Sequence, residues 1–255
     1  GALAKQVAGA LFGGLFERGV PLSRRLAIAG AFSASGARFA AGTVVRGVGA
    51  NRPAKLLRLW DLERCPHSRA VRESLSELDL DFEVRPCPVG GARFRGELNG
   101  KTTPRLEDPN LNVVLDGRAD ILRHLHTTYG DGSTRWLMTS APVVVLGSLN
   151  MRVMQGNRGG DAQPSRAPEQ PLELWGFEAS PYCHFARAAL SELELPYVQH
   201  NLAKDSSKRA AFAEKTGRTQ FPYLEDANTG AKLFESARIV EYLRSTYGAA
   251  PKLSA

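Results

Sequence analysis

Hydrophobic and polar residues alternate in two short stretches of the chain, and each stretch predicts a β-strand. Leu57 and Leu59 share one face of the first stretch, and Leu172 and Leu174 share the matching face of the second, as a half-buried strand requires. In both places a turn follows and opens a helical pattern. Proline stands early in each helix, where its missing N–H is not needed. Both stretches therefore predict a strand, a turn and a helix.

The two stretches belong to a longer internal repeat. The run LRLWDLERCPHSRAVRESLSELDLDF from Leu57 matches LELWGFEASPYCHFARAALSELELPY from Leu172, at an offset of 115 residues. Further along, PRLED from Pro104 matches PYLED from Pro222, and LHTTYG matches LRSTYG, both at an offset of 118. Two blocks in the same order indicate a duplication. The change of offset means that one connection differs in length between the copies.

Each copy predicts the element order βαβ, then α, then ββα. In the second copy the middle helix is clearest at 208–215, a hairpin turn falls at 226–230, and 237–247 forms the last helix. The predicted fold class is α/β, with a right-handed parallel crossover in the first half of each copy. The chain divides into a basic apolar extension (1–55), a first domain (56–130), an apolar segment and linker (131–170) and a second domain (171–249).

The segments outside the repeat have distinct compositions. Residues 156–170 are rich in Gly, Pro, Gln, Ser and Arg, which predicts a flexible linker. Residues 134–154 are apolar and are expected to pack on a domain or lie on a surface. Residues 3–16 place Leu, Val and Phe on one helical face. That helix either packs on the folded body or contacts a membrane surface through residues 1–20. The Ala-, Gly-, Ser- and Arg-rich residues that follow resemble an organelle-targeting composition.

Charge and cysteine content narrow the classes of function. The net charge is +7, but residues 1–55 carry eight basic side chains and one acidic side chain, so the rest of the chain is neutral. A neutral body argues against a nucleic-acid partner. Three cysteines are too few for a disulfide-stapled secreted fold. No run of apolar residues reaches the length needed to span a bilayer.

The strand-to-helix turn is the place where a thiol gains reactivity, because the helix dipole stabilises a thiolate there. The first copy reads Cys65-Pro66-His67-Ser68, with Arg64, Arg69 and Arg72 nearby to favour the thiolate. The second copy reads Ser180-Pro181-Tyr182-Cys183. The candidate catalytic residues are Cys65, Ser180 and Cys183. Alternatively, Cys65 is an inert half-buried thiol and Cys183 a buried structural one. Cys87 follows the second strand and either resolves an oxidised Cys65 or plays no part.

Two further elements recur near the ends of the copies. Thr103-Pro104 and Phe221-Pro222 each precede a strand-like run. A cis bond there would leave the preceding backbone groups open to a peptide-like ligand, whereas a trans bond would make each a simple strand-edge proline. Glu235-Ser236 precedes the last helix of the second copy, where it either caps the helix or binds an amino-acid-like group. The first copy has Gly117-Arg118-Ala119 instead.

Together these motifs resemble the glutathione-binding N-terminal domain of glutathione S-transferases and glutaredoxins, and the tandem arrangement resembles plant plastid proteins that duplicate this domain. The resemblance covers 56–130 and 171–248 and implies two tandem thioredoxin-like domains behind an N-terminal helical extension. The residues it implies in glutathione binding are Tyr182, Phe221, Pro222, Glu235, Ser236, Thr103 and Pro104. Of these, Tyr182 lies with Ser180 beside the glutathione sulfur, Phe221 before a cis proline pairs with the cysteinyl part, and Glu235 with Ser236 holds the γ-glutamyl end.

Two classes of function follow. The first is a glutathione-linked thiol redox or transferase-like protein, in which Cys65 forms a mixed disulfide and the partner is glutathione, a glutathionylated protein or a thiol protein. The second is a non-catalytic binding or scaffold protein with degenerate sites. A third possibility is an iron–sulfur cluster held by Cys65 and glutathione across a dimer. No metal site and no tightly bound cofactor are otherwise expected, and the resemblance implies a chloroplast location. In complete glutathione S-transferases an all-helical domain that forms the hydrophobic substrate pocket follows this domain. Here a short apolar segment and linker follow the first copy and a few residues follow the second, so ordinary conjugation of hydrophobic electrophiles is not expected unless the two copies build a pocket between them.

Overall fold

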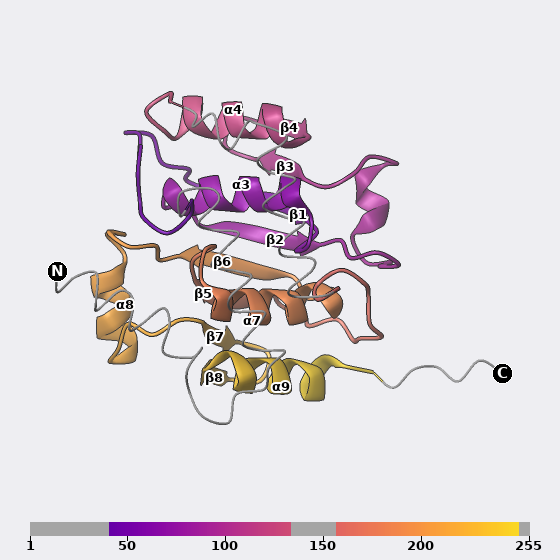
Figure 1. The fold of residues 1–255 in the computed structure, drawn as a ribbon. Coiled ribbons are helices and arrows are strands. Elements are labelled where there is room, and N and C mark those ends of the chain that lie inside the picture. The colour runs from indigo at the N-terminus through magenta and orange to yellow at the C-terminus, as the bar shows by residue number, and fades with distance from the viewer. Residues whose placement is uncertain (1–40, 134–156, 250–255) are drawn as a thin grey trace.

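The computed structural model of the chain describes residues 41–133 and 157–249. The amphipathic segment at 3–16 and the apolar segment at 134–154 lie outside these ranges. The described part is an α/β fold in which two similar sets of elements follow one another (Figure 1). We call residues 57–130 the first unit and residues 172–248 the second unit.

Each unit contains four strands and three helical segments. Those of the first unit are β1 (Leu57–Asp61), α3 (Pro66–Glu77), β2 (Phe82–Pro86), η1 (Arg95–Leu98), β3 (Arg105–Asp108), β4 (Val113–Asp116) and α4 (Arg118–Thr128). Those of the second unit are β5 (Leu172–Gly176), α7 (Pro181–Glu192), β6 (Tyr197–Asn201), α8 (Arg209–Thr216), β7 (Tyr223–Asp226), β8 (Ala231–Phe234) and α9 (Ser236–Tyr247).

The described strands form one continuous sheet in the order β4-β3-β1-β2-β6-β5-β7-β8. Within each unit the first two strands are parallel, which confirms the predicted parallel pairing, and the hairpin strands are antiparallel. The units join edge to edge, because β2 pairs antiparallel with β6 from Phe82↔Gln199 to Val84↔Tyr197. This pairing satisfies the backbone groups of two strands that would otherwise be exposed edges.

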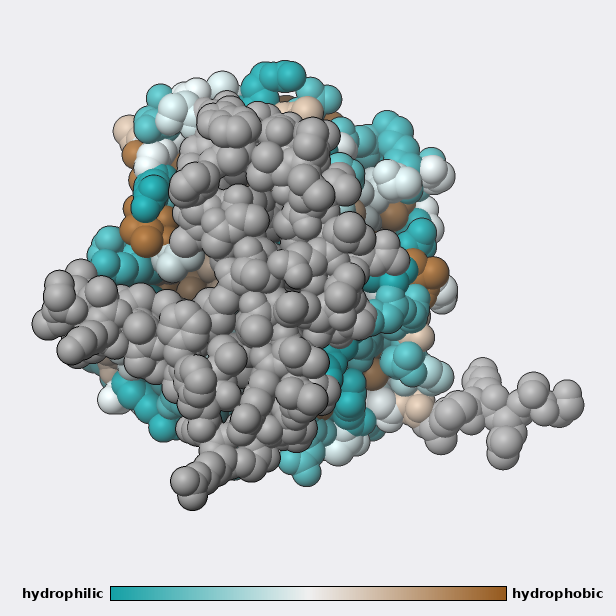
Figure 2. Space-filling model, viewed as in Figure 1, coloured by the Kyte–Doolittle hydropathy of each residue, from teal (hydrophilic) through white to brown (hydrophobic). Residues whose placement is uncertain are grey.

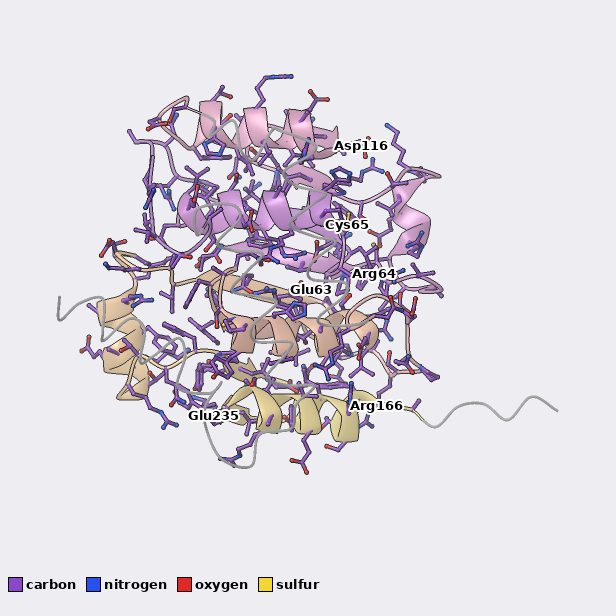
Figure 3. The ribbon with its side chains drawn as sticks, viewed as in Figure 1. Glu63, Arg64, Cys65, Asp116, Arg166 and Glu235 are labelled. Atoms are coloured by element: carbon purple, nitrogen blue, oxygen red, sulfur yellow. The ribbon has the colours of Figure 1, made fainter. Side chains whose placement is uncertain are left out.

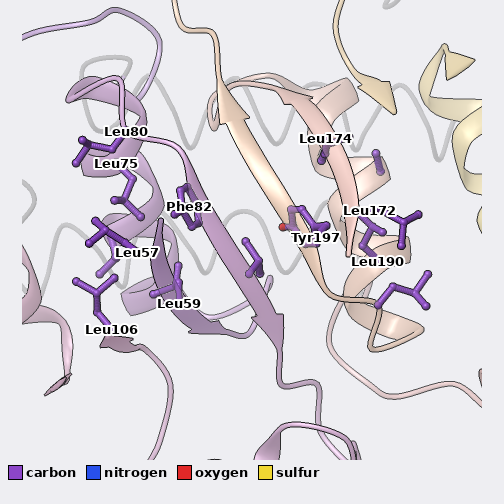
Figure 4. Packing of buried hydrophobic residues seen from close by; sticks show 14 of the residues in the cluster. Leu57, Leu59, Leu75, Leu80, Phe82, Leu106, Leu172, Leu174, Leu190 and Tyr197 are labelled. Carbon is purple, nitrogen blue, oxygen red and sulfur yellow. The ribbon is translucent and has the colours of Figure 1, made fainter. Parts of the chain in front are cut away.

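One hydrophobic core runs through both units. Leu57, Leu59 and Phe82 of the first unit belong to the same buried cluster as Leu172 and Tyr197 of the second (Figure 4). The helix α3 packs beside α4, and α7 packs beside α9 (Figure 1). Full burial of one such side chain stabilises the fold by roughly 1.5–3 kcal/mol, so the shared core ties the position of one unit to that of the other.

Two segments outside the units also follow the repeat, and we call them strap 1 (residues 41–49) and strap 2 (residues 157–166). Gly42 of strap 1 and Gly159 of strap 2 make matching bonds. Their N–H groups donate to Glu77 (3.3 Å) and Glu192 (2.8 Å), and their carbonyls accept from Ser76 and Ser191 (2.9 Å each). Strap 1 then pairs with Lys204 of the second unit, and strap 2 with Val89 of the first. Residues 157–166, expected to be flexible linker, are therefore hydrogen-bonded to both units.

The units differ in the connection after their second strand. The second unit has the predicted helix α8, whereas the first has only the single 3-10 turn η1. The expected α-helix is thus wrong for the first unit, where Gly90, Gly91 and Gly96 lower helical propensity. Around the margin of the view in Figure 2, where the described residues are coloured, hydrophilic residues predominate and hydrophobic ones are scattered. Within the described ranges, no helix combines the length and apolar character needed to cross a membrane.

Candidate functional site

In the first unit Cys65 stands at the N-cap of α3, immediately before Pro66. Its side chain is half-buried, and its sulfur lies 4.0 Å from the backbone oxygen of Thr103. The Thr103–Pro104 peptide bond is cis. The structure therefore brings together the cysteine turn and the proline loop that the sequence places 38 residues apart.

A cavity of about 360 Å³ lies beside this cysteine turn. It opens between the turn, the proline loop and the N-terminus of α4, and its lining comprises His67, Thr102, Thr103, Pro104 and residues 116–120. Burial lowers the pKa of Arg118, and burial together with Arg118 lowers the pKa of His67. The cavity wall thus carries the imidazole of His67, whose lowered pKa favours the neutral form, and the guanidinium of Arg118. Asp116, also in the lining, pairs with Lys101 at 2.6 Å.

In the second unit Ser180 takes the N-cap position of α7. Its hydroxyl oxygen accepts a hydrogen bond from the backbone N–H of Cys183 at 3.3 Å. The Cys183 thiol is fully buried against Gly176, where an added Cβ would lie 2.6 Å from the sulfur. Burial also raises the pKa of Cys183. Cys183 is therefore a packed structural thiol, and Tyr182 beside it is half-buried.

In the second unit, contacts between side chains connect the serine turn, the proline loop and the start of α9. Phe221 precedes the cis proline Pro222 and meets Phe177 edge to face at 6.2 Å, which links the proline loop to the serine turn. Gln220 donates to the Glu235 carboxylate, which links the same loop to the start of α9. Glu235 is exposed, whereas Ser236 is buried. The N-cap of α9 is Glu235, and Ser236 is the first helical residue rather than the cap.

The backbone at Glu235 marks the position as unusual. Its φ is 71°, a value that L-residues rarely adopt. Gly117 holds the matching place in the first unit, with φ 83° and open space around it. Non-glycine residues in such regions cost about 1–3 kcal/mol and cluster at functional sites. At this position the backbone of the second unit is strained and that of the first unit is not. The second unit presents a carboxylate there, whereas the first unit has no side chain.

Cys87 lies apart from the candidate sites. It is fully buried with Trp60 and Leu98, and its thiol donates to the backbone oxygen of Arg85 at 3.5 Å. Burial and the carboxylate of Asp61 raise its pKa to about 12. All three cysteines are free in the structure. Cys87 is thus a poor source of thiolate, which weakens the hypothesis that it resolves an oxidised Cys65.

The arginines expected to favour a Cys65 thiolate have other partners. Arg69 pairs with Glu73 at 3.0 Å, and Arg72 pairs with Asp61 at 2.6 Å and with Glu178 at 3.0 Å. Figure 3 shows Glu63 at the junction of the two units, Cys65 and Asp116 in the first unit, and Glu235 in the second. Sequence reasoning missed the acids at this junction, although Glu63 and Glu178 recur at the offset of 115 that relates the turns.

Comparison with known proteins gives the same two regions. The family model described as "Glutathione S-transferase, N-terminal domain" matches residues 59–133 and 174–251. A curated protein of Beauveria bassiana, described as glutathione S-transferase-like protein OpS6, is 32% identical over 85 residues, which are 33% of this chain and 39% of that protein. The chain thus spans well under half the length of that relative. No solved structure gives a significant match. In the part of the chain described, no three His, Cys, Asp or Glu side chains gather as a metal site.

Proposed function

Because the chain belongs to the glutathione S-transferase N-terminal domain family, we propose that it is a glutathione-linked thiol protein built from two such domains in tandem. Each domain has a thioredoxin-like order of elements. The first domain supplies the reacting thiol, and the second supplies the residues that hold glutathione. The observation that carries the proposal is the placing of Cys65, a half-buried thiol at a helix N-terminus, next to the backbone that precedes a cis proline and beside a cavity.

The proposed reaction is thiol–disulfide exchange at Cys65. The Cys65 thiolate attacks the glutathione sulfur of a glutathione-containing disulfide, a new S–S bond forms between Cys65 and glutathione, and the old S–S bond breaks. The departing sulfur leaves as a thiolate and takes up a proton from water. A second glutathione thiolate attacks the mixed disulfide, releases oxidised glutathione and restores Cys65. The unbonded N–H groups of the first turn of α3 and the helix dipole point at the N-cap position that Cys65 occupies.

The second domain is proposed to hold glutathione without reacting with it. Glu235 would pair with the ammonium group of the γ-glutamyl end, and the first N–H groups of α9 beside Ser236 would bind its carboxylate. The backbone of Phe221 would pair with the cysteinyl part, beside Ser180 and Tyr182. The strained backbone of Glu235 and its contact with Gln220 support this assignment. Gly117 in the first domain offers no such carboxylate.

The setting of the protein is also a proposal. The composition of residues 1–55 and the resemblance to plastid proteins favour the chloroplast stroma, with membrane-surface contact through residues 1–20. All of the net charge of +7 belongs to residues 1–55, which argues against nucleic acid as the partner of the domains. Fractionation of cells that express the tagged chain would test the location.

The reaction is tested by mass spectrometry of the full chain after incubation with oxidised glutathione. The proposal expects one glutathione adduct per chain, attached to Cys65, and none in Cys65→Ser. The adduct should disappear when reduced glutathione is added. The absence of an adduct in the wild-type chain would favour the second candidate, a non-catalytic scaffold. That candidate draws support from the single sheet and shared core, which hold two incomplete sites at a fixed separation.

A further inference from the structure

The two site turns meet at a buried cluster of charged residues that the proposed reaction does not use. Glu63 lies two residues before Cys65, and Glu178 lies two residues before Ser180. Two arginines complete the cluster, Arg72 from α3 and Arg187 from α7. The side chains of these four residues are between 1% and 4% exposed, although each is charged. Charges are buried so deeply only when they are paired.

Arg72 binds the turns of both units. Its Nη2 donates to the backbone oxygen of Glu63 at 3.0 Å, in the segment that leads into Cys65. Its Nε and Nη2 also donate to the carboxylate of Glu178 in the second unit, at 3.0 and 3.2 Å. The guanidinium that fixes the backbone beside Cys65 is therefore itself held by a carboxylate from the other unit.

Arg187 repeats this arrangement in the opposite direction. Its Nη2 donates to the backbone oxygen of Glu178 at 3.4 Å, in the segment that leads into Ser180. Its Nε donates to both carboxylate oxygens of Glu63 at 3.2 Å. Burial raises the pKa of Glu63, but Arg187 and Arg72 outweigh burial and lower it overall. The bonds of the cluster thus cross between the units in both directions.

The cluster is not fully symmetric, because the arginine that holds the Cys65 turn has an additional partner. Asp61 adds two bonds to Arg72, at 2.6 and 2.8 Å. Its counterpart in the second unit is Gly176, whose place is filled by the Cys183 thiol. His184 of α7 adds a bond to Glu63 at 2.7 Å, where the first unit has Arg69. Arg72 therefore has more carboxylate partners than Arg187, and Glu178 is the one among them that comes from the second unit.

We propose that Glu178 is a positioning residue for the turn that carries Cys65, and that Glu63 is a positioning residue for the turn that carries Ser180. Loss of one carboxylate leaves a buried guanidinium short of an acceptor, so the guanidinium shifts and releases the backbone oxygen it holds. The second unit is then a structural part of the first unit's site, whatever ligand the second unit binds. This inference rests on the proposed function only for the role of Cys65 as nucleophile.

The test measures the rate at which iodoacetamide alkylates Cys65 in the full chain between pH 5 and 9. The variants are Glu178→Gln, which removes the charge at nearly constant size, and Glu178→Asp, which keeps the charge and shortens the side chain. Glu225→Gln is the matched control, because Glu225 is also a paired carboxylate of the second unit but contacts Tyr223, Lys215 and Lys232 within that unit. Thermal unfolding checks that each variant is folded.

Coupling through such networks amounts to roughly 2- to 30-fold in a measured constant. Glu178→Gln should therefore change the alkylation rate at pH 7 by about threefold or more and displace its pH profile, and Glu178→Asp should lie between it and wild type. Glu225→Gln should match wild type. If Glu178→Gln does not fold, Glu178→Asp carries the test. Profiles that coincide with wild type in the folded variants would overturn the inference.

Titration of glutathione into the same proteins separates this inference from the proposed function. A changed profile in Glu178→Gln, combined with no glutathione binding by wild type, would reject the proposed function and leave the positioning role in place. Glutathione binding by wild type, combined with unchanged profiles in the variants, would reject the positioning role and leave the proposed function in place.

Discussion

The two units are most alike where residues hold the fold and least alike at the three turns of the candidate sites. Each unit ends its third strand with an aspartate that binds the last helix. Asp108 accepts from Tyr129 and His124, and Asp226 accepts from Tyr247 and Tyr242. At the strand-to-helix turn, by contrast, one unit presents an accessible thiol and the other a serine. Before the last helix one has glycine and the other a strained glutamate. Under the proposed function, the two units share one scaffold but divide the chemistry between them.

The largest expected effect comes from removing the accessible thiol. Cys65→Ser should lower the rate of reaction with a disulfide reagent at pH 8 by about 100-fold or more, because the other two thiols are buried. At that pH a thiol with a pKa of about 12, such as Cys87, is ionised in roughly one molecule in ten thousand. Stopped-flow absorbance measures the rate. Cys183→Ala is the matched variant and should leave the fast phase unchanged; a fast phase that survives in Cys65→Ser would remove the contrast between the units.

A smaller effect is expected from the aspartates that both units share. Asp226→Asn and Asp108→Asn should each lower the free energy of unfolding at pH 7 by roughly 1–3 kcal/mol. Burial raises the pKa of both carboxyls, but hydrogen bonds, from Tyr247 and Tyr242 to Asp226 and from Tyr129 to Asp108, lower it overall. Groups with a lowered pKa stabilise the fold above their unfolded pKa, so the difference from wild type should shrink as the pH falls below about 4.

Urea unfolding monitored between pH 3 and 7 checks both aspartates. The matched control is Asp120→Asn, since Asp120 is exposed and pairs with Arg123 on the surface of α4. A loss of stability that stays constant down to pH 3 in Asp226→Asn would show that the ionised carboxylate is not what holds the last helix.

The smallest effect concerns the glycine and glutamate that begin the last helices. Glu235→Gly should raise the free energy of unfolding by about 1 kcal/mol, because relief of the positive φ outweighs the added freedom of the unfolded chain. Gly117→Ala should lower it by a similar amount, although the site has room for the side chain. Thermal unfolding of both variants measures the two changes in the free energy of unfolding. Equal and opposite shifts would support strain kept for function, and a destabilised Glu235→Gly would contradict it.

Local patterns predicted much of the fold. The alternating leucines gave β1 and β5, the Ser-Pro turn gave the start of α7, and the residues at 226–230 gave the turn between β7 and β8. The pairing of β2 with β6 could not be predicted, because the two strands lie more than a hundred residues apart and neither sequence indicates with which strand it pairs. Strap 2 has the composition of a linker, but hydrogen bonds to distant groups such as Val89 and Glu192 hold it in place.

The candidate sites could likewise be predicted only in part, because some of their features depend on contacts between distant segments. Cys65, the two prolines that the structure shows to be cis and Glu235 could be predicted as site residues from their residue type and their position in the sequence. Glu63 and Glu178 look like ordinary polar residues of exposed turns, and only the meeting of the two units buries them against arginines. Their recurrence at one offset was the available signal, but a repeated charge alone does not reveal a partner in the other unit.

The division of roles between the units is tested most directly by titration calorimetry of glutathione into the full chain and into Glu235→Ala. The account predicts binding to wild type, with affinity lowered about tenfold or more in Glu235→Ala, as expected when a charged hydrogen-bond partner is lost. Cys65→Ser should bind as wild type does, because the thiol belongs to the other unit. No heat of binding to wild type, or equal affinity in Glu235→Ala, would contradict the account.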